Sequence, residues 1–155
     1  MWLKFILSGL IVAFCVALGW FGSEKYRTRK YFFAQLNALN EAYLNELTYA
    51  KKPLDAFLEG RNCTGDFAKL IRSMRKHEQI SFNNFHLTKE ETADCTDYFS
   101  MLGRGDSASQ RGYFTAKSAY LNEKKALTEK EAKSRGELYI KLGLLAGLAF
   151  VILIL

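Results

Sequence analysis

Two stretches without a charged residue lie near the two ends of the chain, at residues 5–22 and 142–155. Eighteen helical residues rise roughly 27 Å, which is enough to cross a thin hydrocarbon core. The second stretch reaches the same length as 138–155, because the lysine near its start can extend its stem to the lipid headgroups. The pattern therefore predicts two transmembrane helices, at residues 1–22 and 138–155.

Between the predicted spans, residues 23–137 have apolar positions at helical spacing and one proline. A long first helix with one apolar face is expected from roughly Tyr26 to Ala50, followed by a short helix between Pro53 and Gly60. A third helix begins near Asp66, whose carboxylate complements the helix dipole. The apolar positions of these helices are Phe33, Leu36, Leu39, Tyr43, Leu47, Leu54, Phe57, Leu58, Phe67, Leu70, Ile71 and Met74. Because no strand pattern competes, we predict an all-α antiparallel bundle.

Two further helices are expected in the second half of this domain. Thr88-Lys89-Glu90-Glu91 has the pattern of a capping box, in which Thr88 and Glu91 satisfy each other's free backbone amides. This helix ends at Gly103 in a left-handed conformation, and Asp106 or Ser107 with Gln110 can cap the helix that follows. That helix is expected to continue into the second span. The residues of the corner are Leu102, Gly103, Gly105, Asp106 and Gln110.

The aromatic-rich connection before the capping box, and the row of apolar positions after the corner, complete the predicted core. Exposed neighbouring phenylalanines would favour aggregation, so we expect the connection to fold back onto the bundle. The helix between the capping box and the corner adds Cys95, Tyr98, Phe99 and Leu102. The other positions are Phe82, Phe85, Leu87, Tyr113, Phe114, Tyr120, Leu121 and Leu127.

Basic residues flank both spans on the side of the central domain. They are Lys25, Arg27, Arg29, Lys30, Lys133, Arg135 and Lys141, whereas Lys4 is the single cation beyond either span. By the positive-inside rule, the central domain faces the cytoplasm and both chain ends lie outside. The alternatives are a cleaved signal, with small residues at 17–19, and an exported tail-anchored domain. The distribution of cations favours two spans over both.

The formal net charge of +6 comes from the membrane-flanking residues. From 31 to 132 the chain has 14 lysines and arginines and 14 aspartates and glutamates, so it lacks the electrostatic footprint of a nucleic-acid-binding protein. The basic stripe Arg72, Arg75, Lys76 and His77 is a local exception. It is interpreted as a solvated helix face in preference to a lipid or nucleic-acid patch.

The cysteines and histidines do not have the spacing of a metal site. Cys63 and Cys95 are widely separated thiols, and with His77 and His86 they form no close ligand pair. A disulfide, a metal and a cofactor are therefore not expected. The Arg-Gly-Asp-Ser sequence at 104–107 matches adhesion ligands, and Asn-Cys-Thr at 62–64 matches a glycosylation acceptor. Turn chemistry explains the first, and a cytoplasmic position makes the second a coincidence.

No catalytic signature is found, whether a nucleophile elbow, a Walker A loop, a histidine-metal helix or a carboxylate pair. Glu90, Glu91, Asp94 and Asp97 lie near one another on one predicted helix. They are interpreted as surface carboxylates that keep the helix solvated. We therefore predict no catalytic residue and no enzyme.

Three features resemble one family, the stage III sporulation protein AB family. They are the Leu-Gly-x-x-Asp-x-x-x-Gln corner at 102–110, the glycine-spaced segment at 142–155, and the Tyr-x-x-x-Pro-Leu step at 49–54. The order of span, basic flank, long helix and second span is also similar. Residues 60–88 have no clear counterpart in the family.

The resemblance implies a membrane subunit of the channel-like complex between mother cell and forespore in endospore-forming bacteria. It implies a domain similar in fold to the cytoplasmic domains of platform proteins in type II secretion and type IV pilus machines. Other subunits of the complex and a secretion-type ATPase are the implied partners, and an oligomer is left open.

The expected function is a non-enzymatic scaffold in the cell membrane, with the bulk of the chain in the mother-cell cytoplasm. One alternative is a small membrane-bound sensor or regulator whose bundle binds a soluble ligand. Another is an enzyme with an unrecognised site. A polar cavity would favour the first alternative, and a cleft with several buried carboxylates or histidines the second.

Overall fold

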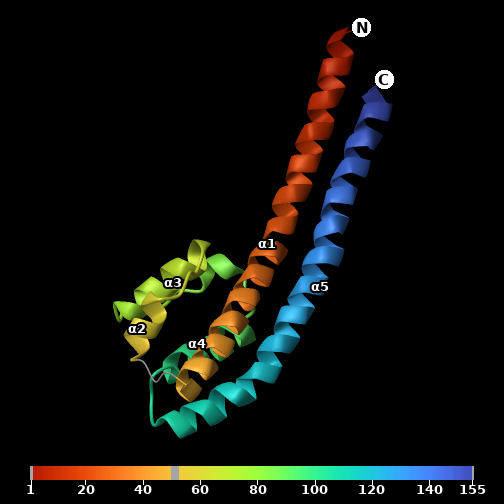
Figure 1. Cartoon of the computed structure of the whole chain (residues 1–155). Coiled ribbons are helices and arrows are strands. Elements are labelled where there is room, and N and C mark those ends of the chain that lie inside the picture. The colour runs from red at the N-terminus through yellow and green to blue at the C-terminus, as the bar shows by residue number, and fades with distance from the viewer. Residues whose placement is uncertain (1, 50–52, 155) are drawn as a thin grey trace. The chain divides into compact units, whose positions relative to one another are not determined.

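The computed structural model of the chain describes residues 2–49 and 53–154. In these ranges it contains five α-helices, one short 3-10 helix and no strand, which confirms the all-α prediction (Figure 1). Ala50, the expected end of the first helix, and part of the step at 49–54 lie outside the described residues. The elements are α1 (Trp2–Tyr49), α2 (Leu54–Glu59), α3 (Gly65–Arg75), η1 (Asn83–Phe85), α4 (Lys89–Met101) and α5 (Ser107–Ile154).

The chain divides into two compact units, which we call the helix pair and the helical domain. The helix pair consists of Met1–Lys30 and Leu127–Leu155, and the helical domain is Tyr31–Ala126. Both α1 and α5 belong to both units and are 48 residues long. The sequence predicted this continuity for α5. The apolar N-terminal segment and the long first helix of the domain are likewise one continuous helix, α1, because no proline interrupts it up to residue 49. The boundaries at 22 and 138 stay predictions, because they depend on the position of the bilayer.

In the helix pair, α1 and α5 lie side by side with the N-terminal and C-terminal ends of the chain together (Figure 1). Both helices are long and apolar enough to cross a membrane. Their large apolar side chains point outward, and Trp2, Phe21 and Ile152 are each at least 70% exposed. Glycines fill the contact between the helices. A Cβ atom on Gly19 would lie 2.6 Å from the backbone carbonyl oxygen of Tyr139. A Cβ atom on Gly143 would lie 2.6 Å from the backbone carbonyl oxygen of Cys15.

The helical domain is built around aromatic residues. Phe32 contacts Phe85 with 4.6 Å between ring centroids, and Phe114 lies 5.0 Å from Tyr43 and 5.1 Å from Tyr98. The two contacts of Phe114 are edge-to-face, and such contacts stabilise the core beyond the burial of apolar area. Phe82 and Phe85 of the connection are buried, as the sequence predicted, and Leu87 packs against them partly exposed.

Two positions differ from the predicted apolar stripe. Phe32 was not predicted to be buried but is 1% exposed, because the rings of Phe67 and Phe85 cover a second side of α1. Leu127 was predicted to continue the core of the last helix but is 43% exposed, and it is where the second part of the helix pair begins.

Candidate functional site

The corner between α4 and α5 is a tight turn that requires glycine. Leu102 has φ −61° and ψ 122°, Gly103 has φ +76°, and the Arg104 amide donates to the Met101 carbonyl oxygen over 3.2 Å. These values describe a type II turn, whose third residue favours glycine because its φ is positive. A Cβ atom on Gly103 would also lie 2.8 Å from Leu54 Cδ2. Gly105 has a positive φ as well, at +82°.

Asp106 and Gln110 have different roles at the start of α5. The Ser109 amide donates to the Asp106 carboxylate over 3.4 Å, and hydrogen bonds from Ser109 lower the pKa of Asp106. The Gln110 side chain was expected to take part in this cap, but it is buried and bonds elsewhere. Its amide donates to the Gly105 carbonyl oxygen over 3.1 Å, and its oxygen accepts from the Tyr43 hydroxyl.

Tyr43 therefore connects the corner to α1. Its hydroxyl donates to Gln110 and accepts from the Gly103 amide over 3.3 Å. Burial raises the pKa of Tyr43, so the hydroxyl keeps its proton for the bond to Gln110. The sequence did not indicate this link, because Tyr43 and Gln110 are 67 residues apart.

Thr88 and Glu91 form a capping box at the start of α4. The Thr88 amide donates to Glu91 Oε2, and the Glu91 amide donates to Thr88 Oγ1, each over 3.2 Å. The second carboxylate oxygen, Oε1, lies 3.0 Å from Lys124 Nζ. Glu91 is 1% exposed, which corrects its interpretation as a solvated surface carboxylate. A buried carboxylate needs such partners, since an unpaired buried charge is strongly destabilising.

The same face of α4 carries two more carboxylates that bind α5. Asp94 accepts from the Tyr120 hydroxyl over 2.8 Å, and Asp97 accepts from the Tyr113 hydroxyl over 2.6 Å. Burial, together with the neighbouring carboxylate, raises the pKa of both tyrosines. Glu90 is exposed and outside this row. These carboxylates therefore hold α4 and α5 together.

A signal for this row exists in the sequence but lies on the partner helix. The α5 side chains that face the carboxylates recur at steps of three and four residues. Lys117 lies between the two tyrosines, 5.6 Å from one ring and 5.7 Å from the other. The row on α5 consists of Tyr113, Lys117, Tyr120 and Lys124.

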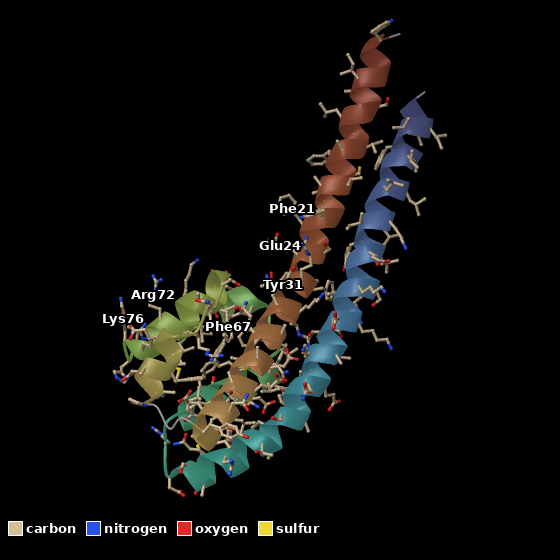
Figure 2. All side chains as sticks on the ribbon, in the orientation of Figure 1. Phe21, Glu24, Tyr31, Phe67, Arg72 and Lys76 are labelled. Carbon is tan, nitrogen blue, oxygen red and sulfur yellow. The ribbon has the colours of Figure 1, made fainter. Side chains whose placement is uncertain are left out.

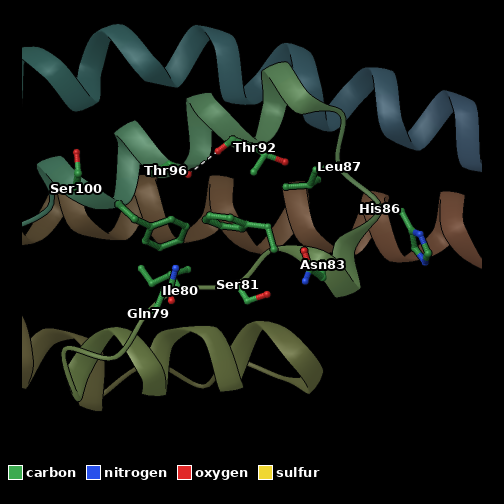
Figure 3. Close-up of a pocket in the computed structure, with 11 residues that line it drawn as sticks. Gln79, Ile80, Ser81, Asn83, His86, Leu87, Thr92, Thr96 and Ser100 are labelled. Atoms are coloured by element: carbon green, nitrogen blue, oxygen red, sulfur yellow. Dashed lines mark hydrogen bonds between the residues drawn. The ribbon is translucent and has the colours of Figure 1, made fainter.

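A groove of about 1120 Å³ lies between the 79–87 connection and α4 (Figure 3). Phe82 and Phe99 line its apolar part, while Ser81, Asn83 and His86 lie on the side of the connection. A row of hydroxyls from α4 forms the opposite wall. Each donates to its own helix backbone: Thr92 to Thr88 over 2.9 Å, Thr96 to Thr92 over 2.7 Å and Ser100 to Asp97 over 2.8 Å. The groove was not predicted, because the sequence did not indicate how far the 79–87 connection lies from α4.

The thiols and histidines lie apart. Cys95 is buried, and burial raises the pKa of its thiol to about 12. Cys63 is half-buried, and burial raises its pKa as well. His77 and His86 are exposed and have positive φ values of 55° and 52°. Among the described residues no group of three or more His, Cys, Asp or Glu side chains could hold a metal ion.

The basic stripe on α3 is exposed, as its interpretation as a solvated face requires. Arg72 and Lys76 point away from the core residue Phe67 (Figure 2). Arg75 lies 3.2 Å from Glu59, and Lys76 lies 3.8 Å from Glu78. Exposed ion pairs of this kind contribute little to stability.

Six of the seven membrane-flanking cations fall into two groups. Arg29, Lys30 and Lys141 pair with carboxylates, at 2.6 Å to Glu131, 3.7 Å to Glu129 and 3.6 Å to Glu137, respectively. Lys25, Arg27 and Arg135 lie over aromatic rings instead. Lys133 is exposed.

Comparison with known proteins gives one family. The family model for stage III sporulation protein AB matches residues 72–155, which include the capping box, the corner and the C-terminal apolar segment. The step at 49–54 and all of α1 precede the match. No curated protein and no solved structure gives a match. Because the family model covers more than half of the chain, this protein belongs to the stage III sporulation protein AB family.

Proposed function

We propose that this protein is a non-enzymatic, membrane-anchored scaffold subunit of a sporulation channel complex between mother cell and forespore. The observation that carries the proposal is the architecture of α1 and α5. Each runs without interruption from the helical domain into an apolar segment of the length of a span. Membership of the family indicates that the process is sporulation. Two membrane anchors would hold the helical domain at the membrane surface, where other subunits and a secretion-type ATPase can bind it.

The helical domain is assigned to the mother-cell cytoplasm. The helix pair has both chain ends at one end, as two spans require, and seven cations flank the spans toward the domain. Labelling intact cells with a membrane-impermeant thiol reagent tests this assignment. Cys95 is unsuitable because it is buried, so Cys95→Ser should be combined with Ser81→Cys, which places an exposed thiol in the groove. Labelling before lysis would put the domain outside the cell.

Removal of the second span tests the scaffold role. A chain lacking 142–155 should keep a folded helical domain, because Leu121 is the last residue of the buried hydrophobic core. It should fail to co-purify the other subunits from sporulating cells, and spores should not form. His86→Ala and Glu90→Ala, which change exposed side chains, are the matched controls and should sporulate normally. Normal assembly by the truncated chain would contradict the proposal.

The groove favours one second candidate, a sensor or regulator that binds a soluble ligand. Its polar lining and volume of about 1120 Å³ are sufficient for a small molecule. Thr96→Trp would fill the groove, and Thr115→Trp would add the same bulk to an exposed site on α5. If the protein is a scaffold, both variants should sporulate equally well as long as the complex assembles. Loss of sporulation in Thr96→Trp with an intact complex would favour the sensor.

A further inference from the structure

Three aromatic residues and three cations lie near one another along the helix pair in two sets of contacts, and we call them together the aromatic–basic cluster. The Tyr26 and Tyr139 rings lie with their centroids 6.0 Å apart and join the two helices. Gly22 makes room for this contact, because a Cβ atom there would lie 3.0 Å from Tyr139 Cδ1. The set between the two helices consists of Tyr26, Tyr139, Lys25 and Arg135. The second set is the pair Trp20 and Arg27, on another side of α1.

The rings orient the cations. Lys25 Nζ lies 5.0 Å from the Tyr26 centroid and 5.8 Å from the Tyr139 centroid. The Arg135 guanidinium lies 5.9 Å from the centroid of the Tyr26 ring. Arg27 lies 5.1 Å from the Trp20 ring. A cation held against an aromatic face leaves its other N–H donors available to an anion.

Carboxylates compensate these cations only in part, since Glu131 acts electrostatically on Arg135. Lys25, Arg27 and Arg135 form no ion pair within the ranges that the structure describes. The nearby carboxylates at 129, 131 and 137 pair with the other flanking cations. Glu24 is an exposed carboxylate of the same segment and leaves the cluster with a net positive charge. The cluster is therefore a site for an anion.

The position of the cluster along the helices indicates which anion. Trp20 and Tyr139 lie at the domain-side ends of the two apolar segments. Tryptophan and tyrosine are enriched at the membrane–water interface, and basic sites between helices at this level bind anionic headgroups. Guanidinium groups also match phosphate oxygens in geometry.

We propose that the aromatic–basic cluster binds the phosphate of an anionic phospholipid headgroup in the leaflet that faces the helical domain. This inference rests on the membrane placement given under Proposed function. It goes beyond that placement, because a general positive flank would attract anionic lipid without holding it at one position. The cluster selects a lipid at the seam between α1 and α5.

Trp20 is a built-in reporter for this site, and Trp2 is a control near the opposite end of the helix pair. The full chain would be reconstituted into phosphatidylcholine vesicles with a minor fraction of brominated lipid, either phosphatidylglycerol or phosphatidylcholine. Bromine near the headgroup end of the acyl chain quenches adjacent tryptophan fluorescence. In Trp2→Phe, we expect Trp20 to report roughly fivefold enrichment of the brominated anionic lipid over the neutral one. In Trp20→Phe, Trp2 should report no enrichment.

Matched triple variants identify the residues responsible. Lys25→Gln, Arg27→Gln and Arg135→Gln together should remove the preference at Trp20. Lys69→Gln, Arg72→Gln and Lys76→Gln remove the same charge from the exposed surface of α3 and should leave the preference unchanged. Equal loss in both variants, or equal quenching by both lipids, overturns the proposal.

Two further outcomes are distinguishable. If inorganic phosphate in excess removes the preference, the cluster takes a free phosphate and not a lipid headgroup, and the proposal is wrong. If neither tryptophan is quenched by either lipid, the apolar segments are outside the bilayer. In that case the membrane placement fails together with this inference, whereas equal quenching by both lipids leaves the placement standing.

Discussion

The two units of this protein use side-chain size in opposite ways. In the helical domain, large rings point inward, and some buried polar side chains form hydrogen bonds across helices. Asn40, for example, donates to the Phe114 carbonyl oxygen over 3.2 Å and accepts from the Tyr98 hydroxyl over 3.2 Å. In the helix pair, large side chains point outward and glycines point inward. This is the arrangement expected of helices that lie in lipid, because water drives apolar groups together whereas lipid does not.

The comparison predicts the largest effect for an aromatic side chain of the helical domain. Phe114 is fully buried and contacts Tyr43, Tyr98 and Tyr113. Phe114→Ala should lower the free energy of unfolding of the full chain in detergent by about 3–5 kcal/mol, because it leaves a cavity. Thr115→Ala, at the neighbouring exposed position, should lower it by less than about 0.5 kcal/mol. Similar values for both would mean that Phe114 is not in a packed core.

A smaller loss is expected from a buried polar contact. Glu91→Ala removes the partner of Lys124 and one half of the capping box. The expected loss is about 2 kcal/mol, which is below that of a fully buried pair because Lys124 is partly exposed. Glu90→Ala, one residue away and exposed, should be nearly neutral. Denaturant titration of the two variants side by side measures the difference, and equal midpoints would contradict the burial of Glu91.

Two glycines of the helical domain should respond with opposite signs. Gly103→Val puts a branched side chain at a φ of +76° and against Leu54, so it should destabilise by roughly 1–3 kcal/mol. Gly112 lies inside α5 with no atom within 4 Å of a Cβ position, so Gly112→Ala should stabilise by up to about 1 kcal/mol. Thermal melting resolves both. A stable Gly103→Val variant would show that the turn can take another form.

The smallest effect on stability, and the sharpest test of register, is expected in the helix pair. A Cβ atom on Gly147 would lie 3.4 Å from Cys15 Cβ, close to the separation found in disulfides. Gly147→Cys should therefore form an intramolecular disulfide under mild oxidation, with loss of two free thiols by mass spectrometry. Gly9→Cys, whose Cβ would have no atom within 4 Å, should not do so. The opposite result would mean that α1 and α5 pack in another register.

Local patterns predicted local structure well. Pro53 and Gly60 bound α2, and the spacing of Thr88 and Glu91 predicted the cap that α4 contains. In these cases the bonded atoms lie within one turn of helix. The apolar stripe predicted most of the core, apart from Phe32, because neighbours on two sides of α1 widen its buried face.

Contacts between distant segments were not predictable in the same way. Three examples are the Glu91–Lys124 ion pair, the Tyr43–Gln110 hydrogen bond and the groove. Each joins elements whose distance from one another cannot be predicted from the helical periodicity of apolar residues. A row of carboxylates on one helix has the same sequence pattern whether it faces water or a second helix. The partner row on α5 was the missing information.

The hydroxyls of Thr92, Thr96 and Ser100 have a consequence for anything that enters the groove. Each hydroxyl hydrogen is already used within α4, so this wall presents oxygen lone pairs. A group that rests against it must supply its own N–H or O–H donors, as an amide, an ammonium or a guanidinium group does. A carboxylate has only acceptor oxygens and would form no hydrogen bond with this wall. The wall therefore favours groups with hydrogen-bond donors over groups with acceptors alone, whatever their net charge.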